Sequence, residues 1–346
     1  MVARARGTRV GYDVRDFGSL GADADVNTDT IQAAIDYADA NKGGTNYLHG
    51  ASVILPAGVQ AQSGWPTRGG ITIPQGIGLV GESENGSTLR WNLDIAETEG
   101  ITYCVGALGN RGTSTQVLNA YVKNLSIGVY GSTNCAALLD MLYFDYCVEP
   151  TLENVRAAGI NSVGYTLTTG IHYVDCMNAN VNGFVSDGGW TSILGASGAS
   201  SLGLRLSRFS HMFLYGSRAT AISLTSADDN IFNGLFVETY SVTQANSAGI
   251  KVNNSNRNNF GGYKCKSSNL PLANSVEVLG TSVGNLVNGI PAKAGAYALG
   301  SFENNLGLSI GNGVAATTPG AVVKKMEVFS AAGVSLGFVP IYDAIT

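Results

Sequence analysis

Residues Asp16 to Asp36 read DFGSLGADADVNTDTIQAAID, and they are the most informative segment of the chain. A glycine-containing loop leads into a short helix, in which apolar residues recur at i, i+3, i+4 and i+7 and form one stripe. These residues are Ile31, Ala34, Ile35 and Ala38. We expect Thr28 to cap the first turn and Asp29 to face the positive end of the helix dipole. A helix from Thr28 to Ala40 is marginal alone, so it is expected to lie on an apolar surface.

The same stretch resembles the opening segment of the pectate-lyase-like parallel β-helix superfamily, bacteriophage tailspikes in particular. The family pattern is Asp-Phe-Gly-Ala, a short loop, Asp-Asp-Thr, and then Ala-Ala-Ile-Gln-x-Ala-Ile. The positions that match without a gap are Asp16-Phe17-Gly18, Gly21, Thr28 and Ile31-Gln32-Ala33-Ala34-Ile35. Three positions depart: Ser19 replaces alanine, Asp23 replaces glycine, and Val26-Asn27 replace the acidic pair. The resemblance implies an all-β chain, folded as a right-handed single-stranded parallel β-helix whose open end the helix covers.

The composition agrees with a chain of many short strands. The 346 residues include 46 glycines, only 13% are charged, 45% are hydrophobic, and the net charge is -5. Glycine and asparagine tolerate the positive φ angles of tight turns. The charge is not basic enough for a nucleic-acid partner, and no run approaches the roughly 18–20 apolar residues of a membrane span. The basic start lacks an apolar segment behind it, so we expect no signal peptide.

Short strand-like segments repeat along the middle of the chain. They are expected at Val53 to Leu55, Ile71 to Ile73, Leu79 to Gly81, Tyr121 to Ile127, Thr151 to Ala157, Tyr173 to Val185, Gly203 to Tyr215, Asn230 to Val237, Asn258 to Cys265 and Gly284 to Ile290. Their spacing of very roughly 20–30 residues is typical of one β-helix coil, whereas a sandwich shows turns every 8–12 residues. Asn182-Gly183 and Asn233-Gly234 begin the same pattern 51 residues apart, and Asn288-Gly289 begins it again.

Three parts are therefore predicted. Residues 1–50 form the N-terminal segment with its capping helix, residues 51–290 the parallel β-helix, and residues 291–346 a C-terminal β element. In the last part, Val322 to Phe329 and Val334 to Tyr342 flank a turn at Ser330 to Gly333. This unit is similar to the C-terminal element of many tailspikes, which implies a homotrimer. A simple hairpin that caps a monomer is the alternative.

Cysteine and histidine give no sign of a metal site or of a disulfide framework. The five cysteines are Cys104, Cys135, Cys147, Cys176 and Cys265. Their odd number and irregular spacing favour free, mostly buried thiols. We expect neither a cofactor nor a bound metal.

Two acidic residues occupy equivalent places in the repeated Asn-Gly pattern and are the candidate catalytic pair. Asp187 and Glu238 are separated by about two coils, and stacked coils lie ~4.8 Å apart, which predicts a separation of roughly 9–10 Å. That distance approaches the range of inverting glycoside hydrolases, which use one carboxyl group as acid and one as base. Asp175 is the reserve candidate. The alternative is structural: Glu238 pairs with Lys266 across coils as a surface ion pair of little energetic value.

Aromatic and cationic residues near this pair are candidates for binding a sugar. Trp190 follows Asp187 by three positions and is expected to stack on a pyranose ring. Arg208, His211 and Tyr215 lie on the intervening strand and are expected to contact the substrate.

The resemblance implies a phage tailspike of the virion tail. Its expected partners are a bacterial surface polysaccharide (capsule or lipopolysaccharide), two further copies of itself and other tail proteins. Cleavage by hydrolysis is the expected activity. The alternatives are a non-catalytic glycan-binding or structural spike, a polysaccharide lyase, and a secreted pectinase-like enzyme.

Overall fold

The computed structural model forms two compact units, Met1–Leu308 and Ser309–Thr346, which are described separately below. It describes residues 4–6, 9–42, 50–58, 64–83, 86–131, 139–158, 168–198, 203–217, 219–239, 248–267, 274–282, 284–290, 297–299, 322–329 and 335–342. Every statement about structure concerns these residues.

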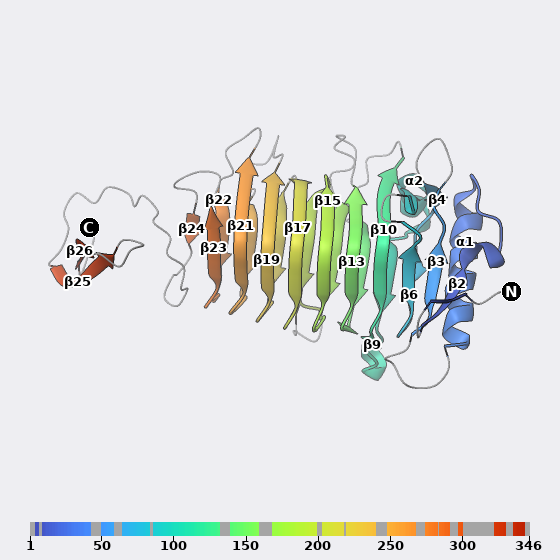
Figure 1. Ribbon diagram of the computed structural model, residues 1–346, viewed down its shortest axis with the longest axis horizontal. Helices are drawn as coiled ribbons and strands as arrows, with labels where there is room; N and C mark the ends of the chain where they lie inside the picture. The colour runs from blue at the N-terminus through green and yellow to red at the C-terminus, as the bar shows by residue number, and fades with distance from the viewer. Residues whose placement is uncertain are drawn as a thin grey trace. The chain divides into compact units, whose positions relative to one another are not determined.

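The first unit is a parallel β-helix, as the sequence predicts, with its strands stacked side by side along one axis (Figure 1). A thirteen-stranded sheet, called sheet A, runs along one side. Its strands are β1 (Arg4–Arg6), β2 (Arg9–Asp13), β3 (Ser52–Leu55), β4 (Trp65–Thr67), β6 (Gly78–Gly81), β7 (Thr88–Asn92), β10 (Tyr121–Tyr130), β13 (Thr151–Ala158), β15 (Asn180–Asp187), β17 (Arg208–Ser217), β19 (Ile231–Thr239), β21 (Asn259–Ser267) and β23 (Leu286–Ile290). Apart from the antiparallel pair β1 and β2, these strands pair in parallel.

A nine-stranded sheet, called sheet B, forms a second side. Its strands are β5 (Ile71–Thr72), β8 (Tyr103–Leu108), β11 (Leu139–Asp145), β14 (Thr168–Val174), β16 (Thr191–Ala196), β18 (Thr220–Thr225), β20 (Ala248–Asn253), β22 (Asn274–Leu279) and β24 (Tyr297–Leu299). A narrow third side consists of β9 (Val117–Leu118), β12 (Cys147–Val148) and a series of parallel bridges that continues to Asn256. Along sheet A from β10 onward, one coil spans between 23 residues, from Arg208 to Ile231, and 30 residues, from Tyr121 to Thr151.

Residues in the left-handed conformation form three columns along the solenoid. The first column follows sheet B and contains Tyr146, Asp175, Gly203, Ser226, Asn254 and Gly280. The second precedes sheet A and contains Asn119, Glu149, Asn178, Leu206, Asp229, Arg257 and Gly284. The third, called the bend column, lies within sheet A and contains Asn124, Asn154, Gly183, His211, Gly234 and Gly262. Positive φ is cheapest for glycine and asparagine, which explains why Asn and Gly recur at the bend.

The interior is built from side chains that repeat coil by coil. Phe209, Phe232 and Phe260 stack with ring centroids 4.4 and 4.8 Å apart, close to the spacing of the strands. A ladder of buried asparagines accompanies them, because Asn230 Nδ2 donates to Asn258 Oδ1 at 2.8 Å and Asn258 Nδ2 donates to Asn285 Oδ1 at 3.0 Å. These amides satisfy one another where no water reaches.

Helix α1 (Ala24–Ala40) covers the N-terminal end of the solenoid, with Ile31, Ala34 and Ile35 fully buried. The predicted helix is correct, but its predicted start and cap are wrong. Asp23 is the cap and accepts from the backbone N–H groups of Asp25 and Val26. The helix starts earlier because an aspartate cap satisfies two of its free amides.

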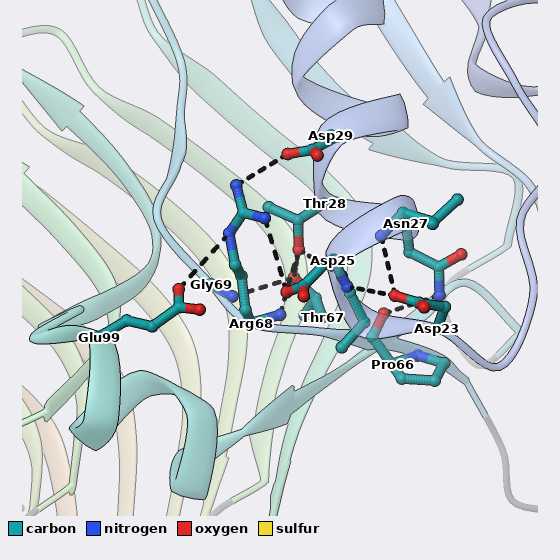
Figure 2. Close-up of polar contacts among 12 residues, drawn as sticks. Asp23, Asp25, Asn27, Thr28, Asp29, Pro66, Thr67, Arg68, Gly69 and Glu99 are labelled. Atoms are coloured by element: carbon teal, nitrogen blue, oxygen red, sulfur yellow. Dashed lines mark hydrogen bonds and ion pairs between the residues drawn. The ribbon is translucent and has the colours of Figure 1, made fainter.

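Thr28, which is buried, fastens α1 to the first coil in place of capping it. Its hydroxyl donates to the Ala24 carbonyl and contacts the hydroxyl of Thr67 at 2.7 Å. Figure 2 shows these contacts beside Arg68, whose guanidinium binds Asp29 at 2.7 Å. Asp29 therefore meets a cation on the solenoid, while Asp25 is the acidic residue of the first turn.

The strand predictions agree with sheet A and fail for much of sheet B. The segment Tyr173 to Val185, predicted as one strand, contains the end of β14 and most of β15, separated by a corner at residues 175–179. Strands β8, β11, β16, β18, β20 and β22 were not predicted. The Asn-Gly pattern is confirmed, since the register aligns Asn182 with Asn233 and Asn288 through the intervening strands.

The second unit contains the predicted strand-turn-strand element. Strand β25 (Val322–Phe329) pairs with β26 (Ser335–Tyr342) in an antiparallel register. The predicted turn at Ser330 to Gly333 lies outside the described residues.

Candidate functional site

The two predicted catalytic residues lie in one row on the outer edge of sheet A. The register pairs Asp187 of β15 with Tyr215 of β17, and Tyr215 with Glu238 of β19. Asp187 and Glu238 are therefore two coils apart, with the phenol of Tyr215 on the coil between them. Both carboxylate residues are partly exposed.

Three aromatic rings lie at this row, and we call them the aromatic patch: Phe213, Tyr215 and Phe236. The rings of Phe213 and Tyr215 are stacked at 6.2 Å, and the ring of Phe236 lies 5.8 Å from Tyr215 and 6.1 Å from Phe213. Phe213 is 44% exposed, an unusual environment for a large apolar side chain. Tyr215 lies in the row of the two carboxylates, and Phe213 and Phe236 lie in the neighbouring row. The patch is therefore a partly exposed aromatic surface beside the carboxylates.

Ion pairs across coils occupy part of this face. Arg156 Nη2 lies 3.0 Å from Asp187 Oδ2, and both side chains remain more than 40% exposed. The register places Glu238 beside Lys266, whose side chain lies outside the described residues. A surface pair such as Arg156 with Asp187 contributes about 0–1 kcal/mol, so a ligand can compete for the Asp187 carboxylate at little energetic cost.

The predicted sugar-binding residues divide into two groups. Tyr215 lies between the two carboxylates. Arg208, at the start of β17, and His211, in the bend column, lie earlier on the strand and are exposed. His211 Nδ1 is 3.1 Å from Asn182 Oδ1 on the neighbouring strand. Trp190 is half-buried in the turn between β15 and β16, where its carbonyl accepts from the backbone N–H of Ala219.

Asp175, the reserve candidate, is the centre of a structural network. Its side chain is fully buried, binds Arg111, and accepts from the backbone N–H groups of Gly198 and Gly203 at 2.9 Å each. Arg111 also binds Asp145 on the preceding coil. These contacts fill the acceptor positions of the Asp175 carboxylate with groups of the protein itself.

A cluster that the sequence did not indicate lies on the outer face of sheet B. His172 Nδ1 is 2.8 Å from Asp140 Oδ2, and the ring of Tyr143 lies 5.2 Å from the imidazole. Asp140 and His172 are 32 residues apart, so only the coil register brings them together. The cluster could have been predicted only if β11 and β14 had been recognised as adjacent strands from their sequences.

The described residues contain neither a metal-binding cluster nor a membrane-spanning helix. No group of three or more histidine, cysteine, aspartate or glutamate side chains is arranged to hold a metal ion. No helix in the same part of the chain has the length and apolarity needed to cross a membrane. Cys104, Cys147 and Cys176 are free and buried, as predicted; the side chains of Cys135 and Cys265 lie outside the described residues.

Comparison with known proteins finds similar proteins of two kinds. No protein-family model matches it. A segment of 130 residues, 36% of the chain, is 38% identical to the mannuronan C5-epimerase AlgE3 of Azotobacter vinelandii. The match covers only 7% of that epimerase and 9% of the related epimerase AlgE1 of the same organism, so the chain spans less than a tenth of these relatives.

Similar solved structures come from bacteriophages. The gp42 tailspike of Acinetobacter phage vb_AbaP_AS12 aligns with a TM-score of 0.56 and 11% identity, over 84% of this chain and 47% of that one. ORF18 of Geobacillus virus E2 aligns with a TM-score of 0.53 and 14% identity, over 86% and 60% of the two chains. At these identities the likeness concerns architecture, and we conclude that this chain shares its parallel β-helix with a phage tailspike.

Proposed function

We propose that the chain is a tailspike-type protein of the virion tail that binds a bacterial surface polysaccharide on the outer face of sheet A. The observation that carries the proposal is the aromatic patch, a group of three rings beside Asp187 and Glu238 in which Phe213 is exposed and the other two are partly exposed. Aromatic faces present a large apolar area at a low cost in side-chain entropy. Sugar rings have apolar faces of similar size, so a chain of pyranoses can lie across Phe213 and Phe236.

The carboxylates beside the patch support hydrolysis as the reaction. Two coils correspond to roughly 9–10 Å between equivalent positions, close to the upper end of the ~6.5–9.5 Å separation of inverting glycosidases. One carboxyl group protonates the leaving oxygen, and the other activates a water molecule on the opposite side of the sugar. Tyr215, on the coil between them, is in reach of the sugar that bridges the pair.

The test measures cleavage and binding separately. The purified protein is incubated with capsular and lipopolysaccharides from candidate hosts, and new reducing ends, unsaturated products and the anomeric configuration of the product are recorded. Asp187→Asn and Glu238→Gln should each lower turnover by about 10²-fold or more, because each removes an acid or base. Binding should remain in both variants and weaken in Phe213→Ala.

A matched control distinguishes catalysis from loss of a surface charge. Glu153 lies on the outer face of sheet A as well and pairs with Lys123 across coils, but it is on the far side of the bend column. Glu153→Gln should leave both binding and cleavage unchanged. Full turnover in both active-site variants would refute the hydrolytic pair, and binding without cleavage by the wild type would leave a glycan-binding spike.

A further inference from the structure

The outer face of sheet B carries a second group of reactive side chains, which we call the His172 cluster: Asp140, Tyr143, Thr169 and His172. The register pairs Asp140 with Thr169 and Tyr143 with His172 on the adjacent strands β11 and β14. The four residues therefore occupy two neighbouring coils. Nothing in the proposed glycan site uses them, because that site lies on sheet A.

His172 has the geometry of an oriented base. Its Nδ1 lies 2.8 Å from Asp140 Oδ2, and the side chains of His172 and Asp140 are 14% and 9% exposed. A carboxylate only accepts, so Nδ1 carries the hydrogen and Nε2 carries the lone pair. Nε2 has no hydrogen-bond partner among the described residues. The carboxylate thus fixes the tautomer in which the outer nitrogen can take a proton.

Tyr143 supplies a neutral donor beside that base. Its ring lies 5.2 Å from the imidazole and stacks on Tyr103 at 5.9 Å. Desolvation by burial, followed by the negative charges of Asp145 and Asp140, raises the pKa of Tyr143 to about 12. The phenol therefore keeps its proton at neutral pH and can donate it in a hydrogen bond.

Two buried oxygen atoms at the cluster have no hydrogen-bond partner within the part of the chain that the structure describes. They are Asp140 Oδ1 and Thr169 Oγ1, which belong to residues 6% and 0% exposed. A buried polar atom without a partner costs about 1–3 kcal/mol, so such atoms commonly mark a place for water or a ligand. The register places these two residues next to each other, so the unsatisfied polar atoms lie beside the His172 cluster.

The charge of the cluster selects against an anionic substrate. Arg111 is the cation that acts on Tyr143, and it is already engaged by Asp145 and Asp175. Abstraction of a proton next to a sugar carboxylate needs a cation to stabilise the developing charge. Among the described residues, no further cation is recorded at Tyr143 or His172. Activation of a water molecule for attack on an uncharged acyl group does not need a cation.

We propose that the His172 cluster hydrolyses acyl esters, such as O-acetyl groups on a neutral part of a glycan. His172 Nε2 takes a proton from water while the water oxygen bonds to the acyl carbon, and Tyr143 donates a hydrogen bond to the carbonyl oxygen as it gains negative charge. The bond between the acyl carbon and the sugar oxygen then breaks, and His172 returns the proton to that oxygen. The products are a carboxylic acid and a free hydroxyl. Asp140 is a positioning residue.

The full-length protein is tested with para-nitrophenyl acetate and with an O-acetylated polysaccharide, and release of acetate is measured. We expect saturable hydrolysis that falls about 10²-fold or more in His172→Ala, because the general base is lost. Added imidazole should restore part of the rate. Asp140→Asn should lower kcat with little change in KM, since the base is present but in the wrong tautomer. Tyr143→Phe should also lower kcat.

A control variant and two outcomes make the test decisive. Ser223 occupies the row of His172 two coils further on, so Ser223→Ala should retain full hydrolysis. Circular dichroism melting identifies variants that fail to fold, in which case His172→Gln replaces His172→Ala. Acetate release that is unchanged in folded His172 variants would overturn the inference. A His172-dependent unsaturated sugar product in place of acetate would overturn it as well. The release of new reducing ends tests the proposed glycan site on sheet A separately, because ester hydrolysis at the His172 cluster produces none.

Discussion

Asn258 is the central rung of the buried asparagine ladder and offers a quantitative test of what holds the coils in register. Its Oδ1 accepts from the backbone N–H of Asn230 at 3.2 Å and from Asn230 Nδ2 at 2.8 Å. Its Nδ2 donates to the Ala227 carbonyl at 2.8 Å and to Asn285 Oδ1 at 3.0 Å. One side chain thus joins the coil before it to the coil after it.

The Asn258→Ala substitution removes these four bonds but leaves most of the partners satisfied. Asn285 Oδ1 still accepts from the backbone N–H of residue 258, and Asn230 Nδ2 still donates to the Leu204 carbonyl. The Ala227 carbonyl keeps the backbone N–H of Asn256. The backbone N–H of Asn230 is left buried without an acceptor, which costs about 1–3 kcal/mol. When the loss of the other three hydrogen bonds is added to this cost, the free energy of unfolding should fall by about 3–5 kcal/mol.

The assay is thermal unfolding followed by circular dichroism. With an unfolding entropy of about 2.1 cal/mol/K per residue, a loss of 3–5 kcal/mol in a unit of roughly 300 residues corresponds to a fall of about 5–8 °C in melting temperature. Asn259, the next residue, is half-buried on the outer side, and Asn259→Ala should change stability by less than about 0.5 kcal/mol. Equal melting temperatures for the two variants would refute the ladder argument.

Two further outcomes are expected. The full-length protein should be a homotrimer, so light scattering should give about three times the chain mass of 35.8 kDa, and a monomer at micromolar concentration would exclude it. Tyr143→Phe should be less sensitive than the wild type to alkaline unfolding. The pKa of Tyr143 in the folded protein, about 12, lies above its ordinary value of 10.0, because burial disfavours the ionised phenol. The stability that this residue contributes is therefore complete below pH 10 and is lost as the pH rises through 12. Equal melting curves for the two proteins at pH 11 would contradict this.

Sheet A could be predicted from the sequence because its strands carry two signals at once. Apolar side chains alternate along each strand, and an asparagine or glycine stands at the bend, as Asn154, Gly183 and Gly234 do. The repeated Asn-Gly pattern also predicts that Asp187 and Glu238 lie in one row, as the strand register confirms. The catalytic roles of Asp187 and Glu238 stay a prediction, because a shared row determines where the two side chains lie but does not determine whether they react.

Sheet B was missed because its strands are short and their composition is ambiguous. Strand β18 reads TAISLT, and its sequence resembles a polar connection except for three buried apolar residues, Ala221, Ile222 and Leu224. The contacts that matter there join distant residues, such as Asp140 with His172 and Arg111 with Asp175. The prediction that Thr28 caps the helix is wrong for a similar reason, because its partner Thr67 lies 39 residues away. A local sequence pattern cannot predict such pairs, because the length of each coil must be known before distant residues can be aligned.

The three left-handed columns confine changes in chain length to a few places in each coil. Five successive coils keep the same intervals of three and then five residues between their columns, as in Tyr146, Glu149 and Asn154 or in Asn254, Arg257 and Gly262. The connection from the bend to sheet B varies instead, from 11 residues between Gly183 and Leu194 to 19 between Asn124 and Tyr143. Segments can therefore be inserted or exchanged in these connections without altering which side chains face outward on either sheet. The fixed intervals also form a search pattern for related solenoids whose sequences have otherwise diverged.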